Sequence, residues 1–397
     1  PLGLTGGTRI VPSCDPRSIL PAARPGHCEW ESSVVGPTSL VYFIAAVASV
    51  PLVGLGGFVV YAMFRYCPVI VRIFMERPVL LPLRLPPDDS GEAVSFQAID
   101  GLTLAGSYFK ARTPSRAGVL VYSHEFLSDR WSFAPYLDGL RDLGFDVFSF
   151  DYRNHGESLS EPSYQPIQYA TDREVGDLRG ALAYLRSRPD HDPAGFGLFG
   201  VSRGGTTALL VGSIEADVWG VVTDGAFPTR GTITAYMIRW ADIYVRRAWV
   251  LAVLPHFVYR LLGGVARRQA ERELNCVFPD VERAVARLAP RPWFQIHGER
   301  DAYIGTDIAD ALFARAREPK QQWQVAGAKH NRCREAGPEV YARRLAAFFD
   351  RYAPRRVKLG ASIHDAAESR YGEFAAASVR GGASPELVAN VASTLTR

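Results

Sequence analysis

Residues 196–210 read FGLFGVSRGGTTALL, and this stretch decides the fold. Its first part, residues 196–201, is a short apolar run that predicts a strand buried on both faces. Its last part, residues 206–210, begins a run that is compatible with a helix. Between them lies Gly200-Val201-Ser202-Arg203-Gly204, a Gly-x-Ser-x-Gly sequence. The stretch therefore predicts a strand, a tight turn that carries Ser202, and a helix.

The spacing of this motif has a steric reason. A serine on a very tight strand-to-helix turn is strained, and side chains two residues to either side would collide. Glycine at 200 and 204 removes that collision. The start of the helix then directs backbone N–H groups and a positive dipole end towards charge that develops at the serine oxygen. By itself the motif also fits a glycine-rich turn without catalysis, so the rest of the chain decides.

Composition narrows the class of protein. The 397 residues are 47% hydrophobic and 22% charged, enough for one large core plus extensions. The net charge of +4 and the absence of a basic run with interleaved aromatics argue against nucleic-acid binding. The five cysteines are scattered and lack Cys-x-x-Cys spacing. They therefore suggest neither a zinc site nor a disulfide framework. Cys14 and Cys28 could pair in an oxidising compartment.

The N-terminal part predicts a membrane anchor. Residues 1–37 are rich in Pro, Gly and Ser without periodicity, and we expect disorder there. Residues 40–64 are uncharged and long enough to cross about 30 Å of hydrocarbon at about 1.5 Å per residue. We therefore predict a single transmembrane helix over 38–66, with a buried core helix or an uncleaved signal sequence as alternatives. Arginines are more frequent just after this span than before it, which favours a cytoplasmic C-terminal side.

The remaining chain alternates strands and helices. A proline-rich linker is expected over 67–91, an α/β domain over 92–353, and a tail of weak helices or disorder over 354–397. The sequence predicts a hairpin over 93–99 and 102–109, and short apolar strands at 118–123, 145–150, 196–201, 218–223 and 292–297. Helical stretches lie between them. This alternation predicts a mostly parallel sheet flanked by helices, with the site at the carboxyl ends of the strands.

Residues 229–280 interrupt the alternation with an apolar and aromatic segment that contains several arginines. One interpretation is ordinary helical packing in the core. The other is a helical cap over the active face, which contacts a membrane surface through Trp240, Trp249, Arg246 and Arg247.

Two loops downstream supply partners for Ser202. A serine hydroxyl needs a neighbouring base, and that base needs an acid that holds its tautomer. Asp301 and His330 each follow a predicted strand, in the chain order Ser, Asp, His. Glu299 and Asp224 remain alternatives for the acid. Three other histidines in strand-end loops are expected to fix those loops by hydrogen bonding: His124, His155 and His297.

Four segments in this order resemble the α/β-hydrolase superfamily, and most of all its serine aminopeptidase-like and lysophospholipase-like branch. They are the motif at 200–204, the segment DYRNHGES at 151–158, His297-Gly298 with Asp301, and His330. The resemblance covers about residues 92–353. It implies an ester, thioester or amide hydrolase that forms an acyl-enzyme on Ser202 and uses no metal or organic cofactor. It also implies an oxyanion hole formed by the backbone N–H groups of Arg203 and Phe126.

One position departs from the family. Where many members have His-Gly in the oxyanion loop, this chain has His124-Glu125-Phe126, which puts the path of the loop at Phe126 in question. We expect the Glu125 carboxylate to face solvent, with a substrate amine as its alternative partner.

A membrane-anchored serine hydrolase for lipid-like acyl esters is the function predicted here. An acyltransferase with the same three residues and a non-catalytic membrane scaffold are the alternatives, and the oligomeric state stays open.

Overall fold

The computed structural model describes residues 37–76, 81–244 and 255–354. Several expectations lie outside these ranges and are not examined by the structure. They are the disorder of residues 1–36, the tail from residue 355 onwards, the pairing of Cys14 with Cys28, and the membrane contacts of Arg246, Arg247 and Trp249. The chain divides after Gly57 into two units, and the sheet belongs to the second.

The apolar N-terminal segment forms one long helix, α1 (Pro37–Met75). Its most apolar window has a mean hydropathy of 2.2, and none of that window is buried in the protein. It is long and apolar enough to cross a membrane by length and composition. The helix does not end near residue 66 but continues to Met75, because residues 67–75 are still mostly apolar. It thus extends into the segment for which a linker was expected.

The last turns of α1 belong to the second unit and pack there. Cys67, Val71 and Phe74 are buried. The ring of Phe74 stacks on that of Tyr169 with centroids 4.4 Å apart, and meets Phe278 edge-on at 5.1 Å. Aromatic pairs of this kind contribute about 0.5–1.5 kcal/mol beyond burial of their area. The end of the apolar helix is therefore part of the folded domain.

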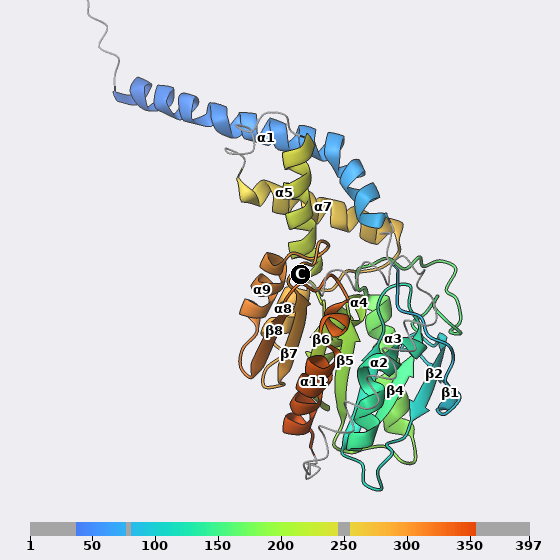
Figure 1. The fold of residues 1–397 in the computed structure, drawn as a ribbon. Helices are drawn as coiled ribbons and strands as arrows, with labels where there is room; N and C mark the ends of the chain where they lie inside the picture. Colours follow the sequence, from blue (N-terminus) through green and yellow to red (C-terminus); the bar gives the residue numbers. More distant parts are fainter. Residues whose placement is uncertain (1–36, 77–80, 245–254, 355–397) are drawn as a thin grey trace, which may run out of the picture. The chain divides into compact units, whose positions relative to one another are not determined.

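Eight strands form a single sheet in the order β1-β2-β4-β3-β5-β6-β7-β8 (Figure 1). The β1–β2 and β2–β4 pairs are antiparallel, and the other pairs are parallel. The expected hairpin and the mostly parallel sheet are thus confirmed. The strands are β1 (Glu92–Gln97), β2 (Thr103–Phe109), β3 (Gly118–Ser123), β4 (Phe145–Phe150), β5 (Phe196–Val201), β6 (Val218–Asp224), β7 (Trp293–Gly298) and β8 (Lys320–Val325).

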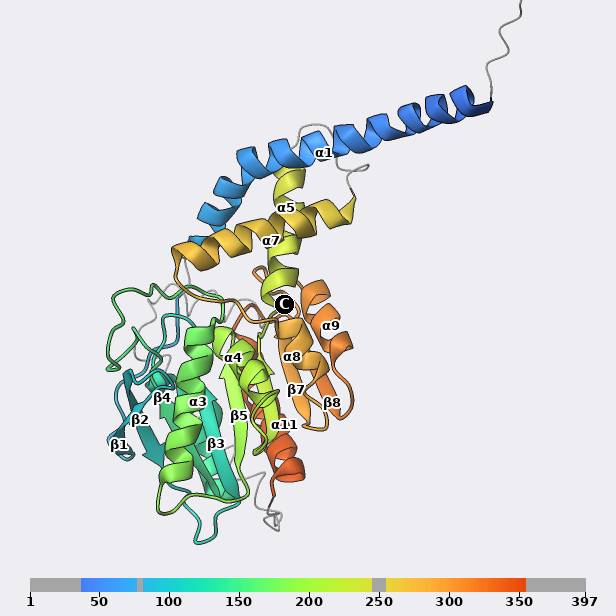
Figure 2. The same ribbon diagram turned by 180° about the vertical axis from the view of Figure 1, so that it is seen from behind.

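Helices cover both faces of the sheet (Figures 1 and 2). One apolar cluster includes Leu178, Leu209, Val285 and Leu312 and joins the sheet to the helices on one face. These helices are α3 (Asp172–Ser187), α4 (Arg203–Gly212), α8 (Val281–Ala286) and α9 (Thr306–Arg315). The second cluster packs the other face against α2 (Ala134–Leu137), the flanking 3-10 turns η1 (Arg130–Phe133) and η2 (Asp138–Leu143), α10 (Cys333–Ala336) and α11 (Pro338–Tyr352).

The insertion after β6 is helical, as expected. It contains α5 (Thr229–Tyr244) and α7 (His256–Glu273), which pack together (Figure 2). Tyr236 of α5 donates a hydrogen bond to the carbonyl of Tyr303, at 2.6 Å, in the loop after β7. Because β5, β7 and β8 run parallel, the loops that follow them lie at one edge of the sheet. The insertion therefore contacts the edge at which the expected site residues gather.

Candidate active site

Ser202 lies at the turn between β5 and α4. Its backbone has φ 52° and ψ −117°, a conformation that is sparsely populated by residues with a side chain. Its N–H donates to the carbonyl of Asp224 at 2.7 Å, and this bond ties the turn to the next strand. A Cβ at Gly200 would lie 2.4 Å from the carbonyl carbon of Gly204, and one at Gly204 would lie 2.1 Å from the carbonyl oxygen of Ser123. Glycine is required at both positions because the turn leaves no room for a methyl group.

His330 and Asp301 meet Ser202 at this edge. The Oγ of Ser202 lies 2.9 Å from Nε2 of His330, and Nδ1 of His330 lies 2.6 Å from Oδ2 of Asp301. The other oxygen of Asp301 accepts the N–H groups of Tyr303 and Ile304, at 2.9 and 2.8 Å. These bonds orient the carboxylate towards the imidazole. The arrangement is the one in which an imidazole can take the proton of a serine hydroxyl while a carboxylate fixes its tautomer.

The two alternative acids have other partners. Glu299 accepts the N–H of Gly327 at 2.9 Å, so its carboxylate holds the turn after β8. Asp224 is fully buried at the end of β6 and accepts the hydroxyl of Tyr341 at 2.9 Å. Burial raises the pKa of Asp224 to about 6. Of the three candidate acids, Asp301 is the one that contacts His330.

The two residues expected to supply the oxyanion hole lie next to each other. Arg203 is the first residue of α4, so its N–H has no partner within the helix. Its guanidinium lies over the ring of Phe126, 5.1 Å from the centroid. Both side chains are buried, and within the described part of the chain neither backbone N–H has a hydrogen-bond partner. Arg203 follows Ser202 directly, and its free N–H is a group of the kind that a developing oxyanion requires.

The expectation that Glu125 faces solvent is wrong. The residue is only 7% exposed, and its carboxylate accepts the backbone N–H of Leu83 at 2.8 Å and the side-chain amide of Asn331. Burial raises the pKa of Glu125, and the hydrogen bond from the N–H of Leu83 opposes that rise. No sequence pattern indicates the contact with Leu83, because that residue lies 42 positions away in the chain. Asn331 follows His330 directly in the sequence, and this adjacency to the expected base is the one sign that Asn331 lies near the site.

The other histidines of the loops are structural, as expected. His124 bonds the carbonyl of Glu125 through Nδ1 at 2.7 Å and accepts the N–H of Tyr152 at Nε2 at 3.1 Å. Burial lowers its pKa to about 3, so it is neutral. His297 bonds the carbonyl of Ile304 at 2.9 Å, and burial also lowers its pKa. His155 contacts the guanidinium of Arg203 at 3.2 Å and again has a pKa lowered by burial.

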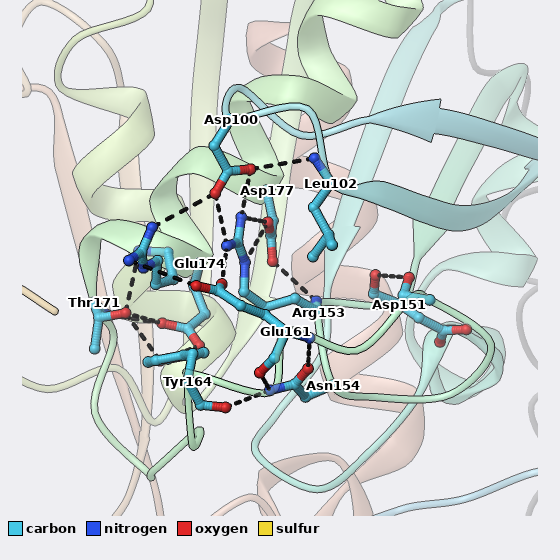
Figure 3. Close-up of polar contacts among 12 residues, drawn as sticks. Asp100, Leu102, Asp151, Arg153, Asn154, Glu161, Tyr164, Thr171, Glu174 and Asp177 are labelled. Carbon is cyan, nitrogen blue, oxygen red and sulfur yellow. Dashed lines mark hydrogen bonds and ion pairs between the residues drawn. The ribbon is translucent and has the colours of Figure 1, made fainter. Parts of the chain in front are cut away.

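A buried arginine organises the loop after β4 (Figure 3). Arg153 is 1% exposed and bonds three carboxylates, those of Asp177 at 2.6 Å, Asp100 at 2.8 Å and Glu161 at 2.5 Å. Several such bonds are needed to offset the desolvation of a buried charge. In the sequence, this arginine stands out only as part of the segment at 151–158. Its contacts join that loop to α3 and to the β1–β2 turn.

A second buried ion pair lies closer to Ser202. Thr171 caps α3 in a capping box with Glu174, and Tyr164 also donates to Glu174 at 2.8 Å (Figure 3). The guanidinium of Arg203 lies 3.4 Å from the same carboxylate, and both side chains are fully buried. The residue that follows Ser202 is therefore held by its side chain as well as by its helix. A cavity of about 400 Å³ lies beside this loop and is lined by Phe126, His155 and Tyr164 among others.

No protein-family model matches the chain. Among curated proteins, the uncharacterized protein YfhR of Escherichia coli (strain K12) is 24% identical over 250 residues, 62% of this chain and 75% of YfhR. The thiohydrolase aneE of Aspergillus aculeatus is 32% identical over 117 residues, which are 29% of this chain and 35% of aneE. The chain thus spans about three quarters of YfhR and about a third of the thiohydrolase.

Solved structures show the fold. An esterase of Pyrococcus furiosus superposes with a TM-score of 0.51 and 20% identity, over 70% of this chain and all of the esterase. The α/β hydrolase GrgF from Penicillium sp. sh18 gives 0.51 and 19%, over 68% of this chain and 99% of GrgF. The chain has an α/β-hydrolase-like fold with a mostly parallel sheet. These likenesses do not single out the serine aminopeptidase-like or lysophospholipase-like branch.

Proposed function

We propose that the protein is a serine hydrolase that cleaves carboxylic esters or thioesters through an acyl-enzyme on Ser202. The observation that carries this proposal is the continuous chain of hydrogen bonds from Ser202 through His330 to Asp301, which starts at a strained serine. Strain at such a residue persists only where the surrounding structure over-determines it, and it is concentrated at functional sites. The esterase and hydrolase structures named above, and the thiohydrolase relative, support the same class of reaction.

The chemistry follows from the geometry. The Oγ of Ser202 attacks the acyl carbon while Nε2 of His330 takes its proton, and Asp301 stabilises the imidazolium that forms. The oxyanion is stabilised by the backbone N–H groups of Arg203 and Phe126, each worth about 2.7–4 kcal/mol of barrier in comparable sites. His330 then returns the proton to the leaving oxygen or sulfur. Water, deprotonated by His330, releases the acid and restores Ser202.

A lipid-like acyl substrate fits the surroundings of the site. The helical insertion contacts the loop that carries Asp301 and exposes large apolar side chains, among them Phe257 and Leu261 of α7. These two residues are four apart, so they share one face of the helix. An exposed apolar face on the same insertion that contacts the catalytic edge favours acyl chains over short soluble peptides. A chain-length series of p-nitrophenyl esters together with short peptides tests this preference, and cleavage of the peptides alone would count against it.

We also propose that α1 anchors the protein as a single-pass helix with the hydrolase domain in the cytoplasm. The length and apolarity of the helix support a span. In the sequence Arg65, Arg72 and Arg77 follow the uncharged run of residues 40–64, and basic residues are retained on the cytoplasmic side. Lipid-like substrates would then lie in the same membrane, near the hydrolase domain.

Labelling by a fluorophosphonate probe tests the reaction class. The detergent-solubilised full chain should react at Ser202, located by mass spectrometry, whereas Ser202→Ala and His330→Ala should not. Asp301→Asn should keep the fold and lower kcat for a p-nitrophenyl ester by about 10⁴-fold, because the imidazole loses its tautomer. Glu299→Gln is the matched control and should leave kcat unchanged. A folded wild-type protein that stays unlabelled would overturn the proposal, and acyl transfer to an added alcohol would reassign it to acyltransferases.

A further inference from the structure

The buried carboxylate of Glu125 joins two loops of the candidate site. It stands in the oxyanion loop, one residue before Phe126, and it accepts the side-chain amide of Asn331, one residue after His330. Asn331 has a left-handed backbone with φ 56°, which asparagine tolerates better than most residues. A Cβ at Gly225 would lie 3.0 Å from Oδ1 of Asn331 and 3.3 Å from Cε1 of His330, so this corner is tightly packed. The position of His330 is thus coupled to the oxyanion loop through Glu125.

The second partner of Glu125 comes from the segment between α1 and the sheet. We call residues 81–86 the strap. Its Leu83 N–H donates to Oε1 of Glu125 at 2.8 Å, and its Leu83 carbonyl accepts the hydroxyl of Ser128. Leu83 and Leu85 also pack against the apolar cluster on one face of the sheet. The strap is therefore fixed on the oxyanion loop by its backbone and its side chains.

The strap also holds a strained residue of that loop. Leu127 has φ 64°, a left-handed conformation that is unusual for a residue with a bulky side chain. The guanidinium of Arg84 donates to the carbonyl of Leu127 through Nη2 at 2.9 Å and Nε at 3.2 Å. Such a conformation persists only when neighbours over-determine it. The strap supplies those neighbours on both sides of Phe126, at Glu125 and at Leu127.

We propose that Glu125 is a positioning residue and that the strap is part of the catalytic apparatus: together they set the backbone of Phe126 and the loop of His330 for the reaction. The inference rests on the proposed serine-hydrolase function and adds to it. Its consequence is that the segment joining the apolar helix to the domain acts on the oxyanion hole and is not a passive spacer. A misplacement of about 1 Å at such a site can lower the rate by about 10²-fold.

Substitutions in the full chain test this role. Glu125→Ala removes both hydrogen bonds and should lower kcat, and the rate of fluorophosphonate labelling, by about 10²-fold with little change in KM. Glu125→Gln should recover kcat to within about tenfold of the wild type. Its amide oxygen can still accept from Leu83. Its amide nitrogen can donate to Oδ1 of Asn331, a buried atom with no partner among the described residues, once the Asn331 amide turns over.

The strap itself is tested from its exposed side. Arg84→Ala removes the two bonds to Leu127 and should lower kcat by about tenfold at unchanged KM, whereas Arg343→Ala on α11 should have no effect. Both substitutions are also usable if Glu125→Ala does not fold. Wild-type kcat in folded Glu125→Ala or Arg84→Ala, an effect on KM alone, or equal loss in Glu125→Gln and Glu125→Ala would each overturn the inference. Absence of any label on wild-type Ser202 would instead overturn the proposed function.

Discussion

At the scale of single residues, two buried carboxylates lie at the same edge and behave differently. Asp301 accepts three hydrogen bonds, from His330 and from two backbone N–H groups. Asp224 is fully buried, and the hydroxyl of Tyr341 and the thiol of Cys333 only partly offset its loss of solvent. Burial therefore raises the pKa of Asp224 to about 6. The site thus holds one carboxylate with three hydrogen bonds and one whose proton is held more tightly because of burial.

The raised pKa makes a prediction about stability. Between about pH 4 and pH 6 the folded protein keeps the proton of Asp224 while the unfolded chain loses it, so the free energy of unfolding falls as the pH rises. The rise of the pKa of Asp224 to about 6 corresponds to about 3 kcal/mol of stability. Asp224→Asn should therefore gain stability relative to the wild type between pH 4 and pH 7. Thermal unfolding of the solubilised protein at several pH values measures this difference.

A carboxylate of the opposite kind gives the control. Arg188 lowers the pKa of Asp190 through a hydrogen bond, so its contribution is present at neutral pH and is lost as the pH falls. Asp190→Asn should accordingly lose stability relative to the wild type as the pH rises. Parallel pH profiles for the wild type and Asp224→Asn would contradict the assignment of a raised pKa to Asp224.

At the scale of elements, α3 contains two glycines with opposite surroundings. A Cβ at Gly176 would meet nothing within 4 Å. A Cβ at Gly180 would lie 2.5 Å from the carbonyl oxygen of Gln97 at the end of β1, because the helix packs there directly on backbone. Alanine is a better helix former than glycine by about 0.5–1 kcal/mol. The close approach at Gly180 allows no such gain.

The two substitutions should therefore differ in sign. Gly176→Ala is expected to raise the free energy of unfolding by about 0.5–1 kcal/mol. Gly180→Ala is expected to lower it by about 1–3 kcal/mol, since β1 or the helix must shift. Denaturant titration of the two variants side by side checks both. Equal effects would mean that α3 does not pack on β1 as described.

At the scale of the whole molecule, the proposed anchor makes a prediction about sidedness. The full chain should stay in the membrane fraction after washing with alkaline carbonate, because the insertion of a spanning helix is effectively irreversible. A membrane-impermeant fluorophosphonate should label Ser202 only after the cells are opened, if the hydrolase domain is cytoplasmic. Labelling in intact cells would show that the hydrolase domain lies on the outer side of the membrane. Release by carbonate would show that α1 does not span.

Much of the fold could be predicted because it depends on local pattern. The apolar runs at β3, β4 and β5 are buried on both faces, and this is how strands of a covered parallel sheet read in sequence. The uncharged run of residues 40–64 predicts a membrane span, whereas the helix itself continues to Met75. Element boundaries depend on packing, as at Phe74, and local pattern carries little of that information.

The sequence by itself determined the turn at Ser202, the need for glycine at 200 and 204, and the order of Asp301 and His330. These follow from steric limits and chain order, which act over a few residues. The tertiary structure decided which acid meets His330, and it turned Glu125 inward. It also placed the strap on the oxyanion loop. Those outcomes depend on residues up to 206 positions apart, as for Glu125 and Asn331. A buried carboxylate needs hydrogen-bond donors, and only the fold brings such donors to it.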